Sequence, residues 1–424
     1  MLRRDFLQAS AGTLAFRASR LSATESNETA AVPLGKAEHC VVIWLGGGAG
    51  QMDTWDPKAL GDPQTKKPGS YYPAIDTAVA GTQVCQHLRR CAPLMDRFNL
   101  IRTVHHDVID EHASAVNRLH TGRPVSETVT YPSLGSVIVN QRGPAGDGVP
   151  PYVLIGYPSA TRGPGFLGAK CGYVYLTDTA SGPAGLSRPP EISAERQIRR
   201  EELLAKVRSE RTANAITKNY DAMISEALRY GKPEFQKIFH LDTEPADLRN
   251  GYGGEFGQRC LLTRRLLQSG VRTVEVAHNL NFLNGTGWDV HNEGILNQFK
   301  LIEELDQALS AFLLDLERNK LLDKTLVVVA TEFGRPAGFD GGGGRGHHGK
   351  CFSIALAGGG LKNGRTIGLT DDLSMQIVER PVSVPDLHAT IYAALGINPK
   401  ENLYAGDRPI PITDGGTPIA ELFV

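Results

Sequence analysis

The sequence predicts an α/β protein built on a doubly wound, mostly parallel sheet that is flanked by helices. Two observations predict this fold class. Short apolar runs recur along the chain, and helical patterns lie between several of them. A strand that is apolar throughout suits a parallel sheet, because helices cover both of its faces. Strands that alternate with helices form the crossover units of such a sheet.

Six apolar runs are the expected strands. The first spans residues 39–45 and is followed by glycines, which favour a tight turn out of the sheet. The other expected strands span residues 98–104, 152–155, 273–277, 326–331 and 352–357. Runs of this length without alternating polar residues predict strands that are buried on both faces.

The clearest expected helix spans residues 295–316. Its apolar side chains recur at spacings of three and four residues, at Ile295, Phe299, Ile302, Leu305, Leu309, Phe312 and Leu316. This spacing places them in one stripe on one face of the helix. The expected strand at 326–331 follows, so the two elements form a crossover unit.

The stretch from about residue 190 to residue 268 breaks this alternation. It is charged, rich in Arg and Glu, and helical in composition. We expect it to be a helical insertion that packs on the core. The expected organisation is therefore one α/β domain over residues 31–424, after an N-terminal signal segment.

The composition argues against two classes of function. The chain has 424 residues and a formal net charge of −1, and it contains no block of like charges. A nucleic-acid-binding protein or a polybasic membrane anchor needs a positive surface. No run approaches the roughly 18 apolar residues that a transmembrane helix needs. We therefore expect no nucleic-acid partner and no transmembrane span.

Residues 1–30 resemble a twin-arginine export signal. Arg3 and Arg4 are followed by Phe6 and Leu7, and a modest apolar stretch continues to Phe16. Such a segment directs export of the protein and takes no part in the fold. It predicts a periplasmic or extracellular protein exported by the twin-arginine route. The alternative is a short amphipathic first helix that begins with two arginines.

The six cysteines are scattered and form no C-x-x-C pair. They therefore predict neither a zinc ribbon nor a small disulfide scaffold. In an oxidising compartment, Cys85 and Cys91 are the nearest local pair for a disulfide. Ordinary buried thiols explain the cysteines equally well.

Acidic and histidine residues follow several expected strands. Asp53 comes after the first strand and its glycines, and Asp289 and His291 come after the strand at 273–277. Because ligands bind beyond the carboxyl ends of strands in open α/β sheets, these positions are candidates for a site. The glycines fit neither nucleotide fingerprint, because Gly-Lys-Ser/Thr is absent and Gln51 replaces the third glycine.

Two further candidates lie later in the chain. Glu332 comes directly after the strand at 326–331, and a glycine-rich loop then carries His347 and His348. Each residue alone is better explained as a helix cap or a hydrogen-bonded side chain. Their joint occurrence at successive strand exits predicts a mixed oxygen and nitrogen site for zinc, manganese, iron or calcium.

Several motifs resemble the exported family called domain of unknown function 1501. The resemblance covers nearly all of the chain after the signal segment, through residues 46–58, 119–124, 131–136, 257–267, 288–291, 332–335, 341–348, 356–361 and 386–396. It implies a fold of the alkaline phosphatase-like superfamily, beside sulfatases and phosphodiesterases. It also implies a two-metal centre that transfers phosphoryl or sulfuryl groups.

The resemblance assigns the metal ligands one by one. It implies that Asp53 is the ligand after the first strand, Asp289 and His291 the middle pair, Glu332 the acid at a strand end and His347 the late histidine. The chain departs from the superfamily pattern at other positions. Phe333 stands where the histidine at the strand end is expected, and Gly346 replaces a common Asp.

The nucleophile is the least defined part of this pattern. Counting back from Gly122 places His112 at the position of the nucleophile, with Ser114 two residues further on. A serine near a metal ion can be activated to attack an ester. The alternative is that Ser114 is an ordinary helix residue.

Three functions are consistent with the sequence. The first is an exported hydrolase of phosphate or sulfate esters that uses divalent zinc, calcium or manganese and acts on a small molecule or a glycan, with Ser114 or water as the attacking group. The second is a degenerate relative that binds a sulfated or phosphorylated ligand without cleaving it. The third is a structural protein of the envelope. The fold cannot separate them, because function resides in the site.

Overall fold

The computed structural model describes residues 34–423, apart from 184, 186, 187, 190, 211–214, 232 and 280–286. The signal segment expected over residues 1–30 lies outside the described residues. Among the described helices, none is long and apolar enough to cross a membrane.

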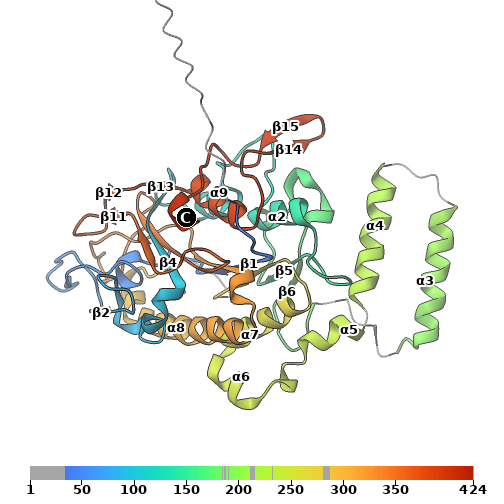
Figure 1. Ribbon diagram of the computed structural model, residues 1–424, viewed down its shortest axis with the longest axis horizontal. Coiled ribbons are helices and arrows are strands. Elements are labelled where there is room, and N and C mark those ends of the chain that lie inside the picture. The colour runs from blue at the N-terminus through green and yellow to red at the C-terminus, as the bar shows by residue number, and fades with distance from the viewer. Residues whose placement is uncertain are drawn as a thin grey trace, which may run out of the picture. The chain divides into compact units, whose positions relative to one another are not determined.

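A nine-stranded sheet lies at the centre of the described chain (Figure 1). Its strand order is β10 (Arg365–Ile367), β4 (Phe98–His105), β9 (Phe352–Gly358), β8 (Thr325–Ala330), β1 (His39–Trp44), β7 (Thr273–Ala277), β5 (Tyr152–Ile155) and β6 (Val174–Leu176), with β13 (Val382–Ser383) also paired to β4. Neighbouring strands are parallel except at β9, which runs antiparallel to β4 and β8. The predicted mostly parallel sheet is therefore confirmed.

Strand β1 shows why the sequences of the central strands are continuously apolar. Val41 and Ile43 belong to the hydrophobic core on one face of the sheet. Cys40, Val42 and Trp44 belong to the core on the other face. Successive side chains of a strand point to opposite faces, so a strand between two helical layers needs apolar residues at every position.

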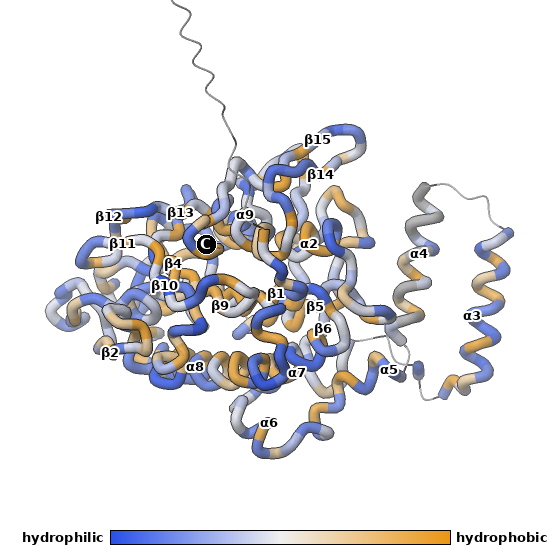
Figure 2. Tube along the Cα trace, viewed as in Figure 1, coloured by the Kyte–Doolittle hydropathy of each residue, from blue (hydrophilic) through white to orange (hydrophobic). Residues whose placement is uncertain are grey.

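Helices α7 (Glu255–Gln268) and α8 (Ile295–Arg318) cover the first face. Figure 1 shows them side by side along one side of the sheet. The expected helix at 295–316 is confirmed, and the alternation of hydrophobic and hydrophilic residues along α8 is visible in Figure 2. Its apolar stripe is fully buried at Leu309 and Phe312, so α8 is held mainly by packing.

Helices α1 (His112–Thr121), α2 (Leu134–Arg142) and α9 (Val384–Ala394) contribute to the core on the second face. Helix α9 begins with a capping box between Ser383 and Asp386. Such a box satisfies backbone N–H groups that have no partner within the helix. The layers on both faces complete the doubly wound arrangement.

The charged stretch after residue 190 is helical, as the sequence predicts. It contains α3 (Ala194–Ser209), α4 (Ala215–Tyr230), α5 (Pro233–Gln236) and α6 (Ala246–Tyr252) before α7. Helix α3 buries none of its residues, whereas α7 packs on α8 and buries residues such as Phe256 and Leu261. Helix α7 is therefore part of the layer that covers the sheet, and the residues before it form the insertion.

Three small hairpins complete the described strands. They pair β2 (Ala74–Asp76) with β3 (Gln83–Cys85), β11 (Leu369–Thr370) with β12 (Ile377–Glu379), and β14 (Asn402–Ala405) with β15 (Arg408–Pro411). All six cysteines are free and buried, so Cys85 and Cys91 form no disulfide.

Replacing Phe312 tests how far α8 depends on its buried stripe. Phe312 is 0% exposed, and Phe312→Ala removes a ring and leaves a cavity. We expect the free energy of unfolding to fall by about 3–5 kcal/mol. Urea unfolding followed by circular dichroism measures it. Leu314→Ala is the matched control, because Leu314 lies on the same helix and is 41% exposed. Equal losses in the two variants would contradict this account of the helix.

Candidate metal centre

The carboxyl ends of β1, β8 and β7 meet at one edge of the sheet. Trp44, the last residue of β1, is in register with Ala277 of β7 and Ala330 of β8. Because these strands are parallel neighbours, the segments that follow them leave the sheet on the same side. The polar residues of these segments are therefore brought together although they are far apart in the sequence.

Three imidazole side chains converge at this edge on one carboxylate oxygen, Oδ1 of Asp289. The Nε2 atoms of His291, His347 and His112 lie 3.1, 3.3 and 3.4 Å from it. The Nε2 atoms of His291 and His347 are 3.0 Å apart. His112, Asp289 and His347 each offer one ligand atom, and these atoms all lie within 4.8 Å of one another.

Glu332 holds the histidine that comes from α1. Its Oε1 lies 2.9 Å from Nδ1 of His112 and accepts a hydrogen bond of 2.8 Å from the amide of Gly47. Gly47 has φ of +118°, and a Cβ atom there would lie 2.4 Å from the backbone nitrogen of Asp289. A side chain is therefore excluded at this position, which explains the glycine after β1.

Arg335 contacts Asp289 inside the protein. Its Nη2 lies 2.5 Å from Oδ1 of Asp289, and both side chains are almost completely buried. Its Nε donates to the carbonyl of Gly48 at 2.9 Å, and its Nη1 donates to the carbonyl of Arg345 at 2.9 Å. The sequence reasoning assigned no role to Arg335, although it stands only three residues after Glu332. The available signal was the arginine five residues after the apolar run that forms β8. A buried charge needs a partner, so such an arginine predicts an ion pair at the strand end.

Asp53 does not join this cluster, contrary to the expectation from the sequence. It lies in the 3-10 helix η1 (Gln51–Asp53), and its Oδ2 accepts a hydrogen bond of 2.7 Å from Nε of Arg345. Its Oδ1 accepts from the amide of Tyr71 at 2.7 Å. Asp53 and Arg345 are both completely buried. Both oxygens of Asp53 therefore have donors from the protein, and Asp53 lies outside the group of His112, Asp289 and His347. Arg345 is a second buried arginine that was not predicted from the sequence.

Helix α1 directs His112 and Ser114 to different places. Glu111 caps the helix, and its carboxylate accepts from the amides of Ala113 and Ser114. The hydroxyl of Ser114 is hydrogen-bonded to Glu111 as well. Residues two apart on a helix do not face the same side, so His112 reaches Asp289 while Ser114 does not. The structure thus places Ser114 against the capping Glu111 and makes His112 a member of the cluster.

The charges around the cluster shift the pKa values of two histidines. Burial alone would lower the pKa of His112, but its hydrogen bonds to Asp289 and Glu332 outweigh burial and raise the pKa to about 9. Burial and the nearby charge of Arg335 lower the pKa of His291. Without a cation, the cluster therefore keeps a proton on His112 at neutral pH.

The donor atoms also fit a divalent ion. In a tetrahedral zinc site with bonds of about 2.0–2.1 Å, neighbouring donor atoms are about 3.3 Å apart. The measured separations between Asp289 Oδ1 and the three Nε2 atoms are 3.1–3.4 Å, and that between His291 and His347 is 3.0 Å. Imidazole and carboxylate together suit zinc, manganese or iron. These residues could therefore hold one such ion.

A cleft of about 1000 Å³ opens beside the cluster. His112, Glu332 and His347 line it. Its other walls include Trp44, Tyr157, Ser159, Thr161 and Arg162. Ligand sites of α/β proteins occupy such positions beyond the strand ends.

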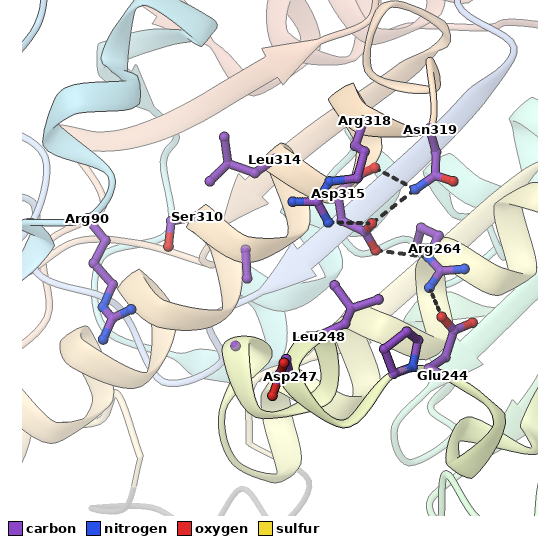
Figure 3. A pocket seen from close by; sticks show the side chains of 13 residues that line it. Arg90, Glu244, Asp247, Leu248, Arg264, Ser310, Leu314, Asp315, Arg318 and Asn319 are labelled. Atoms are coloured by element: carbon purple, nitrogen blue, oxygen red, sulfur yellow. Dashed lines mark hydrogen bonds and ion pairs between the residues drawn. The ribbon is translucent and has the colours of Figure 1, made fainter.

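A second hollow, of about 690 Å³, lies among α6, α7 and α8 (Figure 3). Its buried charges are already paired, because Arg264 contacts Glu244 at 2.7 Å and Asp315 at 2.9 Å. Figure 3 shows the side chains of Glu244, Arg264 and Asp315 pointing towards one another, with dashed lines between them. The hollow lies on helices and away from the strand ends, so we place the functional site at the cleft beside Asp289.

A buried network of charges includes Arg162, which lines the cleft beside Asp289. Glu275, in the middle of β7, contacts Nε of Arg162, Nε2 of His120 at 3.1 Å and the hydroxyl of Tyr152 at 3.2 Å. Burial alone would raise the pKa of Glu275, but Arg162 and His120 outweigh it and lower the pKa to about 2. The carboxylate is therefore ionised at neutral pH.

Comparisons with known proteins give one family and several solved structures. The family model described as "Protein of unknown function (DUF1501)" matches residues 37–423. No curated protein matches the chain. Solved structures similar to it include a lipoteichoic acid synthase from Listeria monocytogenes, with 10% identity, a TM-score of 0.39, and coverage of 89% of this chain and 75% of that one. A sulfatase from Pseudoalteromonas sp. has 12% identity and a TM-score of 0.40, covering 90% and 70%. A protein in the alkaline phosphatase superfamily from Vibrio parahaemolyticus has 10% identity and a TM-score of 0.37, covering 86% and 67%.

The network around Glu275 predicts a dependence of stability on pH. Because its pKa is lowered in the folded protein, the ion pair stabilises the fold above the ordinary pKa of a glutamate and ceases to do so as the pH falls towards 2. We expect Glu275→Gln to lower the free energy of unfolding by about 3 kcal/mol at pH 7. The difference from the unaltered protein should shrink between about pH 4.5 and pH 2.

Urea unfolding at a series of pH values measures this difference. Glu379→Gln is the control, because Glu379 is an exposed glutamate. It should leave the stability unchanged within about 0.5 kcal/mol. A loss in Glu275→Gln that stays constant down to pH 3 would show that the ion pair is not its cause.

Proposed function

The chain belongs to the family described as protein of unknown function DUF1501, and we propose that it is a hydrolase of phosphate or sulfate esters that depends on a divalent metal ion. The observation that carries this proposal is the grouping of His112, Asp289 and His347, whose ligand atoms all lie within 4.8 Å of one another. Three protein ligands leave a position for water or substrate, as in catalytic zinc sites. The set stands on the wall of a cleft that a substrate can enter.

In this proposal, His112, Asp289 and His347 hold the ion, and His291 lies beside them. Glu332 acts through His112, because it contacts Nδ1 and thereby turns Nε2 towards Asp289. A carboxylate behind a histidine ligand fixes the orientation of the ring and makes the ligand more basic. A divalent ion bound here would polarise the ester and lower the pKa of water to near neutrality.

The hydroxyl that the sequence predicts as a nucleophile is not presented to the cleft. Ser114 is hydrogen-bonded to Glu111 and does not line the cleft. We therefore propose that water from the cleft is the attacking group. Arg335 supports the chemistry indirectly, because it fixes the carboxylate on which the three imidazoles converge.

A second function, the binding of a sulfated or phosphorylated ligand without cleavage, is favoured by one specific observation. His291 offers a further donor, 3.1 Å from Oδ1 of Asp289 and 3.0 Å from Nε2 of His347, and zinc sites in which the protein supplies all four ligands are usually structural. A metal ion held in this way could bind an anion at the cleft and leave its ester bond intact. The experiments below separate the two functions.

We also propose a location and a domain organisation. Arg3 and Arg4 suggest export through the twin-arginine route to the periplasm or the outside of the cell. Residues 1–30 would be the signal, and residues 31–424 would be the domain that acts after export.

Metal analysis of the purified protein tests the centre itself. We expect about one divalent ion per chain by elemental analysis, and a higher melting temperature when zinc is added, because the ion binds only the folded state. Asp289→Asn and His347→Ala should each weaken zinc binding by at least about 100-fold. His240→Ala is the control, since His240 is an exposed histidine, and it should bind zinc normally. Folded protein that takes up neither zinc nor manganese nor calcium would end the proposal.

Activity on aryl esters tests the chemistry. Metal-loaded protein should cleave 4-nitrophenyl phosphate or 4-nitrophenyl sulfate, and Asp289→Asn should lower kcat/KM by at least about 1000-fold, because a bound ion contributes several kcal/mol to the transition state. Ser114→Ala should change kcat/KM by less than about threefold, since its hydroxyl faces Glu111. A loss in Ser114→Ala as large as that in Asp289→Asn would instead indicate a covalent intermediate. Metal-loaded protein that binds phosphate or sulfate but cleaves neither ester would favour the binding function.

A further inference from the structure

Arg162 presents one nitrogen of its guanidinium group, Nη2, to the cleft. It lies at the end of the 3-10 helix η4 (Ala160–Arg162) and lines the same cleft as His112 and His347. Its Nε donates to Glu275, and its Nη1 donates to the hydroxyl of Ser159 at 3.2 Å. Within the described chain, Nη2 has no hydrogen-bond acceptor, and it is not among the buried atoms that lack a partner. Solvent in the cleft therefore reaches this nitrogen.

The position of Glu275 is unusual for a carboxylate. It is 2% exposed and lies between Val274 and Val276 in a central strand, where apolar residues normally pack. A buried ion pair is often no more stabilising than apolar residues of the same volume, so stability alone is a weak reason for one. The pair does fix the orientation of Arg162, because the Nε edge of the guanidinium cannot turn away from the carboxylate. The ring of Trp44 lies beneath the same guanidinium, 5.9 Å from its central carbon.

Arg162 is close to the cluster along β1. Trp44 is the last residue of that strand, and three residues later the amide of Gly47 donates to Glu332. At about 3.3 Å per extended residue, Trp44 and Gly47 are at most about 10 Å apart. Helix α1, which carries His112, also contacts η4, and His112 and Arg162 line the same cleft, so one ligand in the cleft can reach both side chains.

We propose that Arg162 binds the anionic oxygens of the substrate, and that Glu275 is the positioning residue that holds Arg162 in place. This inference rests on the proposed function and adds the substrate class: a phosphate or sulfate ester that still carries a negative charge. A guanidinium binds such oxyanions in a fixed, planar geometry that an ammonium group cannot reproduce. Because Nε is already held by Glu275, the guanidinium loses little conformational freedom when Nη2 binds an oxyanion.

Binding of inorganic phosphate and inorganic sulfate tests this role without any turnover. The zinc-loaded full-length protein is titrated with each anion by calorimetry, and the tighter of the two identifies the preferred oxyanion. We expect Arg162→Lys and Arg162→Met to raise the Kd by about tenfold or more, as expected for the loss of a charge-assisted hydrogen bond. Arg408→Met is the matched control, because Arg408 is exposed on β15 and does not line the cleft, and its Kd should be unchanged.

Glu275→Gln separates positioning from a merely structural role. Gln keeps the shape of the side chain but loses the charge, so Arg162 stays present and is less firmly held. We expect a rise in the Kd for the anion and in KM for the aryl ester, with kcat and zinc content little changed. A merely structural pair would lower the melting temperature of Glu275→Gln and leave both Kd and KM as they are.

The outcomes distinguish this inference from the proposed function. If zinc binds and esters are cleaved, but both Arg162 variants bind the anions as the unaltered protein does, Arg162 has no such role and the hydrolase proposal stands. If the unaltered protein takes up no metal but still binds the anions, and Arg162→Lys weakens that binding, the anion site stands and the hydrolase proposal fails. Circular dichroism verifies folding, and Arg162→Lys decides the question if Arg162→Met does not fold, since lysine keeps a positive charge beside Glu275.

Discussion

Asp289 and Arg335 form an ion pair that is closed to solvent, and the loops at the carboxyl edge of the sheet depend on it. Asp289 belongs to the segment after β7, and Arg335 belongs to the segment after β8. The same guanidinium donates to the carbonyls of Gly47 and Gly48, which follow β1. One arginine therefore ties together the segments that leave three neighbouring strands. Removing one partner of such a pair leaves an uncompensated buried charge, which typically costs about 3–5 kcal/mol.

The balance of charge around this pair agrees with the proposed chemistry. Asp289 and Glu332 are the carboxylates of the cluster, and Arg335 is the cation that contacts Asp289. When the histidines are neutral, these groups leave one negative charge, and a divalent ion would convert it to one positive charge. An anionic ester is attracted by the second state and repelled by the first. Without an ion, a proton on His112 supplies part of the same compensation. In both the metal-bound and the metal-free form, a positive charge thus offsets the carboxylates of the site. The two forms differ in net charge and therefore in their affinity for anions.

Much of the fold and part of the site follow from the sequence, because both depend on local patterns. The continuous apolar runs predict the central strands, and the spacing of three and four residues predicts the helix that becomes α8. Asp289, His291, Glu332 and His347 come together because parallel neighbouring strands deliver their carboxyl ends to one edge. A reader of the sequence can therefore place these four residues at one site before any contact is known.

Only the tertiary structure decided which side chains point into that site. His112 and Ser114 are two residues apart, and the orientation of α1 alone selects the histidine for the cluster. Asp53 follows the correct strand, yet Arg345 engages its carboxylate, and that arginine is 292 positions away in the sequence. The partner of a buried charge is set by packing between distant segments and not by local periodicity. The sequence by itself thus determined which segments meet at the edge of the sheet, and the packing of distant segments determined which side chains lie together at the candidate centre.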